Sequence, residues 1–206
     1  MLIQDAIESI DSIRGSWVRV QQISRISGGI QLNFSVCDGR RGKVVDRWTV
    51  TCRGVCEAAI TDWDGGGIAS YPNTHPAAKQ YIGRRARLVW TRSCGEMEMI
   101  AALYKAHVEA VDDWIPFDRY VPVGSPWNGQ SSGRGSRAVS STKLVCSGPA
   151  FLIRAYAKGL KEISGDTKPQ LQYFAPRKSV SPQVLHFGSS YVVANKLIAE
   201  RPGLNA

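Results

Sequence analysis

The segment from residue 17 to residue 52, WVRVQQISRISGGIQLNFSVCDGRRGKVVDRWTVTC, decides the fold class. Its middle part alternates apolar and polar residues, so that Ile30, Leu32, Phe34 and Val36 share one face. This alternation is typical of a half-buried strand. The turn-forming sequences SGG and DGRRG separate the middle run from a strand-like run on each side. The segment therefore predicts consecutive strands joined by tight turns, as in an antiparallel sheet.

Helical periodicity flanks these strands. Ile3, Ile7 and Ile10 fall on one face of a helix predicted over residues 3–14, and residues 95–115 form a longer helix. An apolar stripe of the longer helix is expected to face the core: Met97, Ile100, Tyr104, His107 or Val108, Val111 and Trp114. Two short strand-like runs, EAAIT and ARLVW, lie between the helices. We expect an α+β fold in which an antiparallel sheet packs against helices.

A change of composition suggests a boundary inside the chain. Residues 121–142, VPVGSPWNGQSSGRGSRAVSST, are rich in Gly, Ser and Pro, which predicts a linker or a long loop. An α+β domain over residues 1–120 is expected before it. A smaller basic part over residues 143–206 is expected after it, with helices predicted over residues 148–165 and 189–203.

The positive charge is concentrated in the C-terminal part. The 206-residue chain carries a net charge of +9. Residues 1–125 contain 15 Lys and Arg against 14 Asp and Glu, a net charge of +1, whereas residues 126–206 contain 11 against 3, a net charge of +8. This asymmetry favours a polyanion or an acidic protein as the partner.

Neither a membrane segment nor a cofactor site is predicted. The N-terminal sequence lacks the basic segment and apolar run of a signal peptide, and no window reaches the ~20 apolar residues of a membrane span. We therefore expect a cytoplasmic protein whose five cysteines stay reduced. Cys52 and Cys56 form a C-x3-C pair but lack a second pair of ligands at suitable spacing, so no metal is predicted.

The most conspicuous polar motif is TDWDGGG, residues 61–67, where Asp62 and Asp64 flank Trp63. A calcium loop counted from Asp62 has Asn73 where an EF-hand needs its bidentate Glu, so calcium is not expected. An apolar run ending in D-x-D-G resembles the first motif of the haloacid dehalogenase superfamily. That resemblance implies Asp62 as nucleophile and Asp64 as acid or base, on a parallel sheet that the antiparallel pattern does not favour. A glycine-rich turn is the simplest interpretation.

The chain lacks a coherent set of catalytic motifs, which favours a non-catalytic binding protein without fully deciding against an enzyme. Association with a protein partner is the first hypothesis, as in inhibitors or immunity proteins of bacterial toxin systems, because six tryptophans offer interface anchors. The expected partner-binding residues are Trp63, Asp62, Asp64 and Trp127.

Two other functions stay open. The basic C-terminal part suits nucleic acid, since Lys and Arg contact phosphates and aromatic rings stack on bases. The polyanion-binding candidates are Arg134, Arg137, Arg154, Lys158, Lys161, Arg177 and Lys178. The remaining hypothesis is a phosphate-processing enzyme that uses Asp62 and Asp64.

Overall fold

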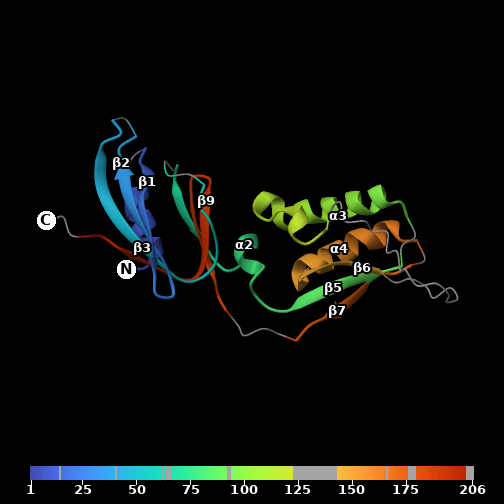
Figure 1. Ribbon diagram of the computed structural model, residues 1–206. Helices are drawn as coiled ribbons and strands as arrows, with labels where there is room; N and C mark the ends of the chain where they lie inside the picture. Colours follow the sequence, from blue (N-terminus) through green and yellow to red (C-terminus); the bar gives the residue numbers. More distant parts are fainter. Residues whose placement is uncertain are drawn as a thin grey trace. The chain divides into compact units, whose positions relative to one another are not determined.

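The structure, a computed structural model, describes residues 1–13, 15–39, 41–61, 63, 66–91, 94–122, 143–165, 167–175 and 180–202. It divides into two compact units (Figure 1): unit 1 is Met1–Tyr81 with Val180–Ala206, and unit 2 is Ile82–Ser179. The division differs from the predicted boundaries at 120 and 143, because the chain returns to unit 1 after completing unit 2. The predicted linker, residues 121–142, lies outside the described residues except for its first two.

Unit 1 contains a six-stranded antiparallel sheet with the strand order β1-β2-β3-β9-β8-β4. Its strands are β1 (Trp17–Ile26), β2 (Gly29–Cys37), β3 (Val44–Ala59), β4 (Ile68–Tyr71), β8 (Gln183–Phe187) and β9 (Ser190–Glu200). The three strands predicted from the 17–52 segment are present in register, and the predicted EAAIT strand continues β3. The α+β class with antiparallel sheets is confirmed.

The edges of this sheet approach each other, so the sheet curls into a closed roll. The backbone N–H of Val18 donates to the carbonyl oxygen of Gly66 at 3.1 Å, and that of Val20 donates to Trp63 at 2.8 Å. Both acceptors lie just before β4, the strand at the opposite edge. Apolar side chains that alternate along the strands fill the interior, among them Leu32, Phe34, Trp48, Val50, Leu185 and Phe187.

Two helices complete unit 1. The predicted first helix is present as α1 (Ile3–Asp11), which buries Ile3, Ala6, Ile7 and Ile10 against the core of the roll. The short helix α2 (Pro76–Lys79) begins at its predicted proline, and the His75 side chain accepts a hydrogen bond from the Ala77 backbone N–H at its N-terminus.

The helix predicted over residues 189–203 is wrong, because this segment forms strand β9. β9 pairs with β3 on one side and with β8 on the other, so its backbone hydrogen bonds are satisfied by neighbouring strands. Buried and exposed residues do not alternate strictly along β9, because the consecutive residues Val192, Val193 and Ala194 are all buried, so the pattern that would otherwise identify a strand is missing. The buried Val192 and Ala194 face the interior of the roll beside Leu185 and Phe187.

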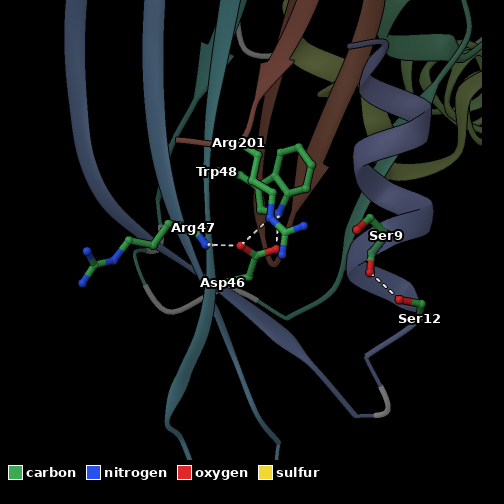
Figure 2. Close-up of polar contacts among 6 residues, drawn as sticks. All are labelled: Ser9, Ser12, Asp46, Arg47, Trp48 and Arg201. Atoms are coloured by element: carbon green, nitrogen blue, oxygen red, sulfur yellow. Dashed lines mark hydrogen bonds and ion pairs between the residues drawn. The ribbon is translucent and has the colours of Figure 1, made fainter. Parts of the chain in front are cut away.

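A buried carboxylate anchors the start of β3 (Figure 2). Asp46 is only 6% exposed, and it accepts hydrogen bonds from the Arg47 backbone N–H at 2.8 Å and the Trp48 indole Nε1–H at 3.0 Å. The Arg201 guanidinium Nε lies 3.0 Å from the same carboxylate and stacks over the Trp48 ring. Because Arg201 follows β9, this cluster ties the C-terminal end of β9 to β3.

Unit 2 is a two-layer α+β arrangement. Its antiparallel sheet has the order β6-β5-β7, with β5 (Arg85–Trp90), β6 (Lys143–Pro149) and β7 (Gln170–Tyr173). The helices α3 (Glu96–Val111) and α4 (Ala150–Ile163) lie on the same side of this sheet (Figure 1). Short 3₁₀ turns, Asp112–Trp114 and Phe117–Arg119, follow α3.

The core of unit 2 lies between the sheet and the helices. Leu88 and Trp90 point from β5 toward Leu103 on α3 and Tyr156 on α4. Gly159 allows the helices to approach closely, because a Cβ at this position would lie 3.0 Å from the Ala102 carbonyl oxygen and 3.1 Å from the Ala106 Cβ.

The apolar stripe predicted to face the core from α3 is partly wrong. Met97 is 77% exposed, Tyr104 is 53% exposed and Val108 is 39% exposed. The buried face of α3 is rotated from the predicted one and consists of Met99, Leu103, Ala106, His107 and Val111. The close contact at Gly159 turns the small residues Ala102 and Ala106 toward α4, and this contact fixes the rotation.

Candidate functional site

The TDWDGGG stretch has a clear structural role at the closure of the roll. The carbonyl oxygens of Trp63 and Gly66 bind β1, and the carbonyl oxygen of Gly67 accepts from the Gly188 N–H at 3.2 Å. The Trp63 side chain is 52% exposed, so its backbone is tied to the sheet while its ring meets solvent. Asp62 and Asp64 lie outside the described residues.

The predicted polyanion-binding residues on α4 are exposed but sit among acidic side chains. Arg154, Lys158 and Lys161 are all exposed. Lys158 lines the groove between α3 and α4 together with Glu98, Glu109 and Glu162, so that surface has mixed charge. The remaining predicted residues lie outside the described part of the chain: Trp127, Arg134, Arg137, Arg177 and Lys178.

A more uniformly basic surface lies on the side of the unit 2 sheet opposite the helices. Alternate residues of a strand point to opposite faces, so Arg85, Arg87 and Val89 point away from the helices that Leu88 and Trp90 contact. Neighbouring strands add Leu144, Ser147, Gln172 and Phe174. We call these seven residues the open face, because no helix among the described residues covers them.

Strand pairing sets the geometry of the open face. Arg87 lies directly between Ser147 of β6 and Gln172 of β7. Two pairs further along, the Phe174 N–H donates to the Arg85 carbonyl oxygen at 2.9 Å, so their side chains are neighbours on the same face. The pairing of the strands therefore brings five side chains next to one another on the open face. They are the guanidinium groups of Arg85 and Arg87, the Phe174 ring, and the uncharged polar groups of Ser147 and Gln172.

The open face has favourable electrostatics for an anion. The Arg87 guanidinium carbon lies 4.8 Å from the centre of the Phe174 ring, which is 39% exposed. Arg85 and Arg119 both line a shallow hollow along β6. The strands β5, β6 and β7 contain no Asp or Glu, and unit 2 as a whole has 15 Lys and Arg against 8 Asp and Glu, a net charge of +7. The surface can therefore attract phosphates while offering a ring for stacking.

Arg85, Arg87 and Phe174 were not predicted as site residues. The ARLVW run was interpreted only as a strand, and the pairing of β5 with β7 joins segments that are far apart in the sequence. The sequence does carry a signal, since two arginines separated by one residue in a strand must share a face.

The buried histidine of unit 2 has a structural role. His107 is 2% exposed, with Nδ1 at 2.7 Å from the Tyr156 hydroxyl and Nε2 at 2.6 Å from the Ile115 carbonyl oxygen. The Nε2–H donates to Ile115, so Nδ1 accepts from Tyr156. Burial raises the pKa of the Tyr156 phenol, which keeps it protonated as a donor. The cluster connects α3, α4 and the turn after α3.

A second polar cluster lies on the outer surface of unit 1 beside α2. The Tyr71 ring stacks on His75 with 4.6 Å between centres and lies 6.3 Å from His186. Burial lowers the pKa of both histidines, and the neighbouring His186 lowers that of His75 further.

Next to this aromatic group, the Glu57 carboxylate accepts hydrogen bonds from the Tyr81 and Tyr191 hydroxyls and from the Gln80 amide. These donors come from the end of α2 and from β9, while Glu57 itself belongs to β3. The carboxylate is therefore engaged in holding α2 on the sheet.

The cysteines and acids do not form a metal centre in the part of the chain that the structure describes, where no group of three or more His, Cys, Asp or Glu could hold an ion. Cys52 lies inside the roll, and burial raises the pKa of its thiol to about 12. Its predicted pair partner, Cys56, is half-buried.

Comparisons with protein-family models, curated proteins and solved structures gave no match to this chain. Among the described residues, none of the helices has the length and apolar character needed to cross a membrane.

Proposed function

We propose that the protein binds single-stranded nucleic acid through the open face of unit 2. The proposal rests on the positions of Arg85, Arg87 and Phe174, which lie side by side on one face of the sheet. This face lacks acidic residues, and no described helix covers it. Sequence-tolerant binding of single strands uses this combination of guanidinium groups for the backbone and rings for the bases.

The two strand arginines serve different phosphates. Residues two apart on a strand are separated by about 6.6 Å, so Arg85 and Arg87 can each contact a phosphate of an extended strand. Arg119 adds a third guanidinium at the edge of the hollow that Arg85 lines. Phe174 offers a ring face to a base once the Arg87 guanidinium moves from the ring to a phosphate.

The experiment is fluorescence anisotropy of a labelled oligothymidine with the full chain at several salt concentrations. Replacing both strand arginines, Arg85→Gln with Arg87→Gln, should reduce the slope of log K against log salt by about 1.4, at about 0.7 per phosphate contact. The matched control removes two charges from the helix side, Lys158→Gln with Lys161→Gln, and should keep the wild-type slope. An unchanged slope in the strand variant, or an equal change in the control, would contradict the proposal.

The ring and the arginines should behave differently in this assay. Phe174→Ala should weaken binding roughly tenfold at every salt concentration and leave the salt slope unchanged, because stacking of a base involves no release of counterions. If Phe174→Ala reduced both the affinity and the slope of log K against log salt, Phe174 would only support the fold of the sheet.

We propose, as a second candidate, that unit 1 associates with a protein partner around Trp63. The observation that favours it is the 52% exposure of the ring on a backbone fixed by the Val20 hydrogen bond. Large aromatic side chains held in place are favoured anchors of interfaces. A partner captured with the tagged full chain should be lost with Trp63→Ala and kept with Trp63→Phe. Equal capture by the Trp63→Ala variant would contradict this role.

A further inference from the structure

The helix α3 carries an apolar surface that the core of unit 2 does not use. Met97, Ala101, Tyr104 and Val108 are all exposed. At 100° per residue these positions fall within an arc of about 60°, so they form one continuous strip along the helix. We call these four residues the α3 strip. Exposed apolar strips of this kind mark interaction surfaces.

The two flanks of the α3 strip differ in character. On one flank the Phe117 ring packs edge-on against Tyr104, with 5.4 Å between ring centres. On the other flank, beside the groove between α3 and α4, lie Glu98, Lys105 and Glu109. The strip thus has an apolar border and a charged border, and this asymmetry restricts how a partner can lie on it.

From these features we propose that the α3 strip binds a second copy of this chain, with the two α3 helices antiparallel about a two-fold axis. An antiparallel two-fold arrangement brings like flanks together, whereas a parallel arrangement would place the charged flank of one copy on the apolar flank of the other. Only the antiparallel arrangement therefore lets the apolar flanks meet each other and the charged flanks meet each other.

The register of the charges supports the same arrangement. The midpoint between Glu98 and Lys105 lies at position 101.5 of the chain, and the midpoint between Met97 and Val108 lies at position 102.5. An axis at position 102, between these two midpoints, brings Glu98 of one copy to within one residue's rise, about 1.5 Å along the helix, of Lys105 of the other, and the symmetry repeats the pair. The same axis brings the large Tyr104 of one copy to within one residue's rise of the small Ala101 of the other, which gives complementary sizes within the strip. The proposal is independent of nucleic-acid binding.

The test is sedimentation equilibrium of the full chain over about a hundred-fold range of concentration, since association follows mass action. The wild-type protein should shift from monomer to dimer mass. Lys105→Glu should remain monomeric, because it creates two contacts between like charges. The double variant Glu98→Lys with Lys105→Glu should restore the dimer mass, since it exchanges the charges and keeps their complementarity.

A matched control reverses the charge of an exposed lysine on α4, outside the α3 strip. Lys161→Glu carries the same change of net charge as Lys105→Glu and should dimerise as the wild type does. A wild-type chain that stays monomeric over the whole range would overturn the proposal. So would a dimer that Lys105→Glu leaves intact, or a double variant that fails to restore it.

Discussion

Replacing Asp46 by alanine is the substitution whose cost is best defined by the structure. The carboxylate accepts from the Arg47 backbone, the Trp48 indole and the Arg201 guanidinium (Figure 2). Of these donors only the indole N–H is deeply buried, because Trp48 is 2% exposed. Asp46→Ala leaves this donor without its acceptor inside the roll, whereas the Arg47 amide and the Arg201 guanidinium can turn to water.

The magnitude follows from these differences in burial. An unsatisfied buried donor costs about 1–3 kcal/mol. The ion pair adds less than about 1 kcal/mol, because the Arg201 side chain is 49% exposed and water screens its charge. We therefore expect Asp46→Ala to destabilise unit 1 by about 1–4 kcal/mol and Arg201→Ala by less than about 1 kcal/mol. Asp46→Asn keeps one carbonyl acceptor and should fall between them.

The assay is hydrogen exchange of the β3 amides under native conditions, which reports the stability of unit 1 separately from that of unit 2. A double-mutant cycle with Trp48→Phe isolates the buried hydrogen bond, and its coupling energy should be about 1 kcal/mol or more. Equal effects of Asp46→Ala and Arg201→Ala would refute the reasoning. They would show that the exposed ion pair dominates over the buried indole contact.

Two further predictions concern stability. Because burial lowers the pKa of His75 and His186 below 6.5 in the folded state, the unfolded chain binds more protons, and stability is lost as pH falls through 6.5 toward the folded values. The urea midpoint of unit 1 should therefore fall between about pH 7.5 and pH 5.5, and His75→Asn with His186→Gln should flatten this dependence. Gly159→Val should destabilise unit 2 by about 1–3 kcal/mol through its contact with Ala102, measured by exchange of the α4 amides, and a stabilised variant would contradict the close approach of the helices.

The elements that could be predicted are those whose signal is local. The strands β1 to β3 follow from alternation with Gly-containing turns, and α1 follows from isoleucines at helical spacing. The sequence carries no such signal for hydrogen-bonded pairing between strands that lie far apart in the chain. The pairing of β3 with β9 joins residues 132 to 151 positions apart, and it makes a strand of a segment whose capping residues favour a helix. The division of the chain into units depends on the same long-range pairing.

The sequence suggested a polyanion as partner, which stays a prediction, but it did not point to the residues of the open face. The excess of positive charge beyond residue 125 favoured a polyanion, and three of the seven predicted residues, Arg154, Lys158 and Lys161, share a face of α4. That face is exposed, yet acids of both helices border it. Charge along one segment cannot show which side of a sheet the helices leave uncovered. This requires knowing that α3 and α4 pack on the same side of β5, a property of the whole unit.

The exposed part of α3 shows how a failed prediction can locate a surface. Its apolar residues satisfy helical spacing, which is why Met97, Tyr104 and, as the alternative to His107, Val108 were expected to face the core. A helix with two apolar faces can bury only one against a two-layer unit such as this, and the contact at Gly159 selects the face that carries the small residues. The apolar side chains of the other face stay exposed to water, and burying them against a partner would be favourable. Sequence periodicity detects both faces equally, so the excess of apolar residues over what one core can cover locates a surface for a partner, and the charges along its flank are what favour a second copy there.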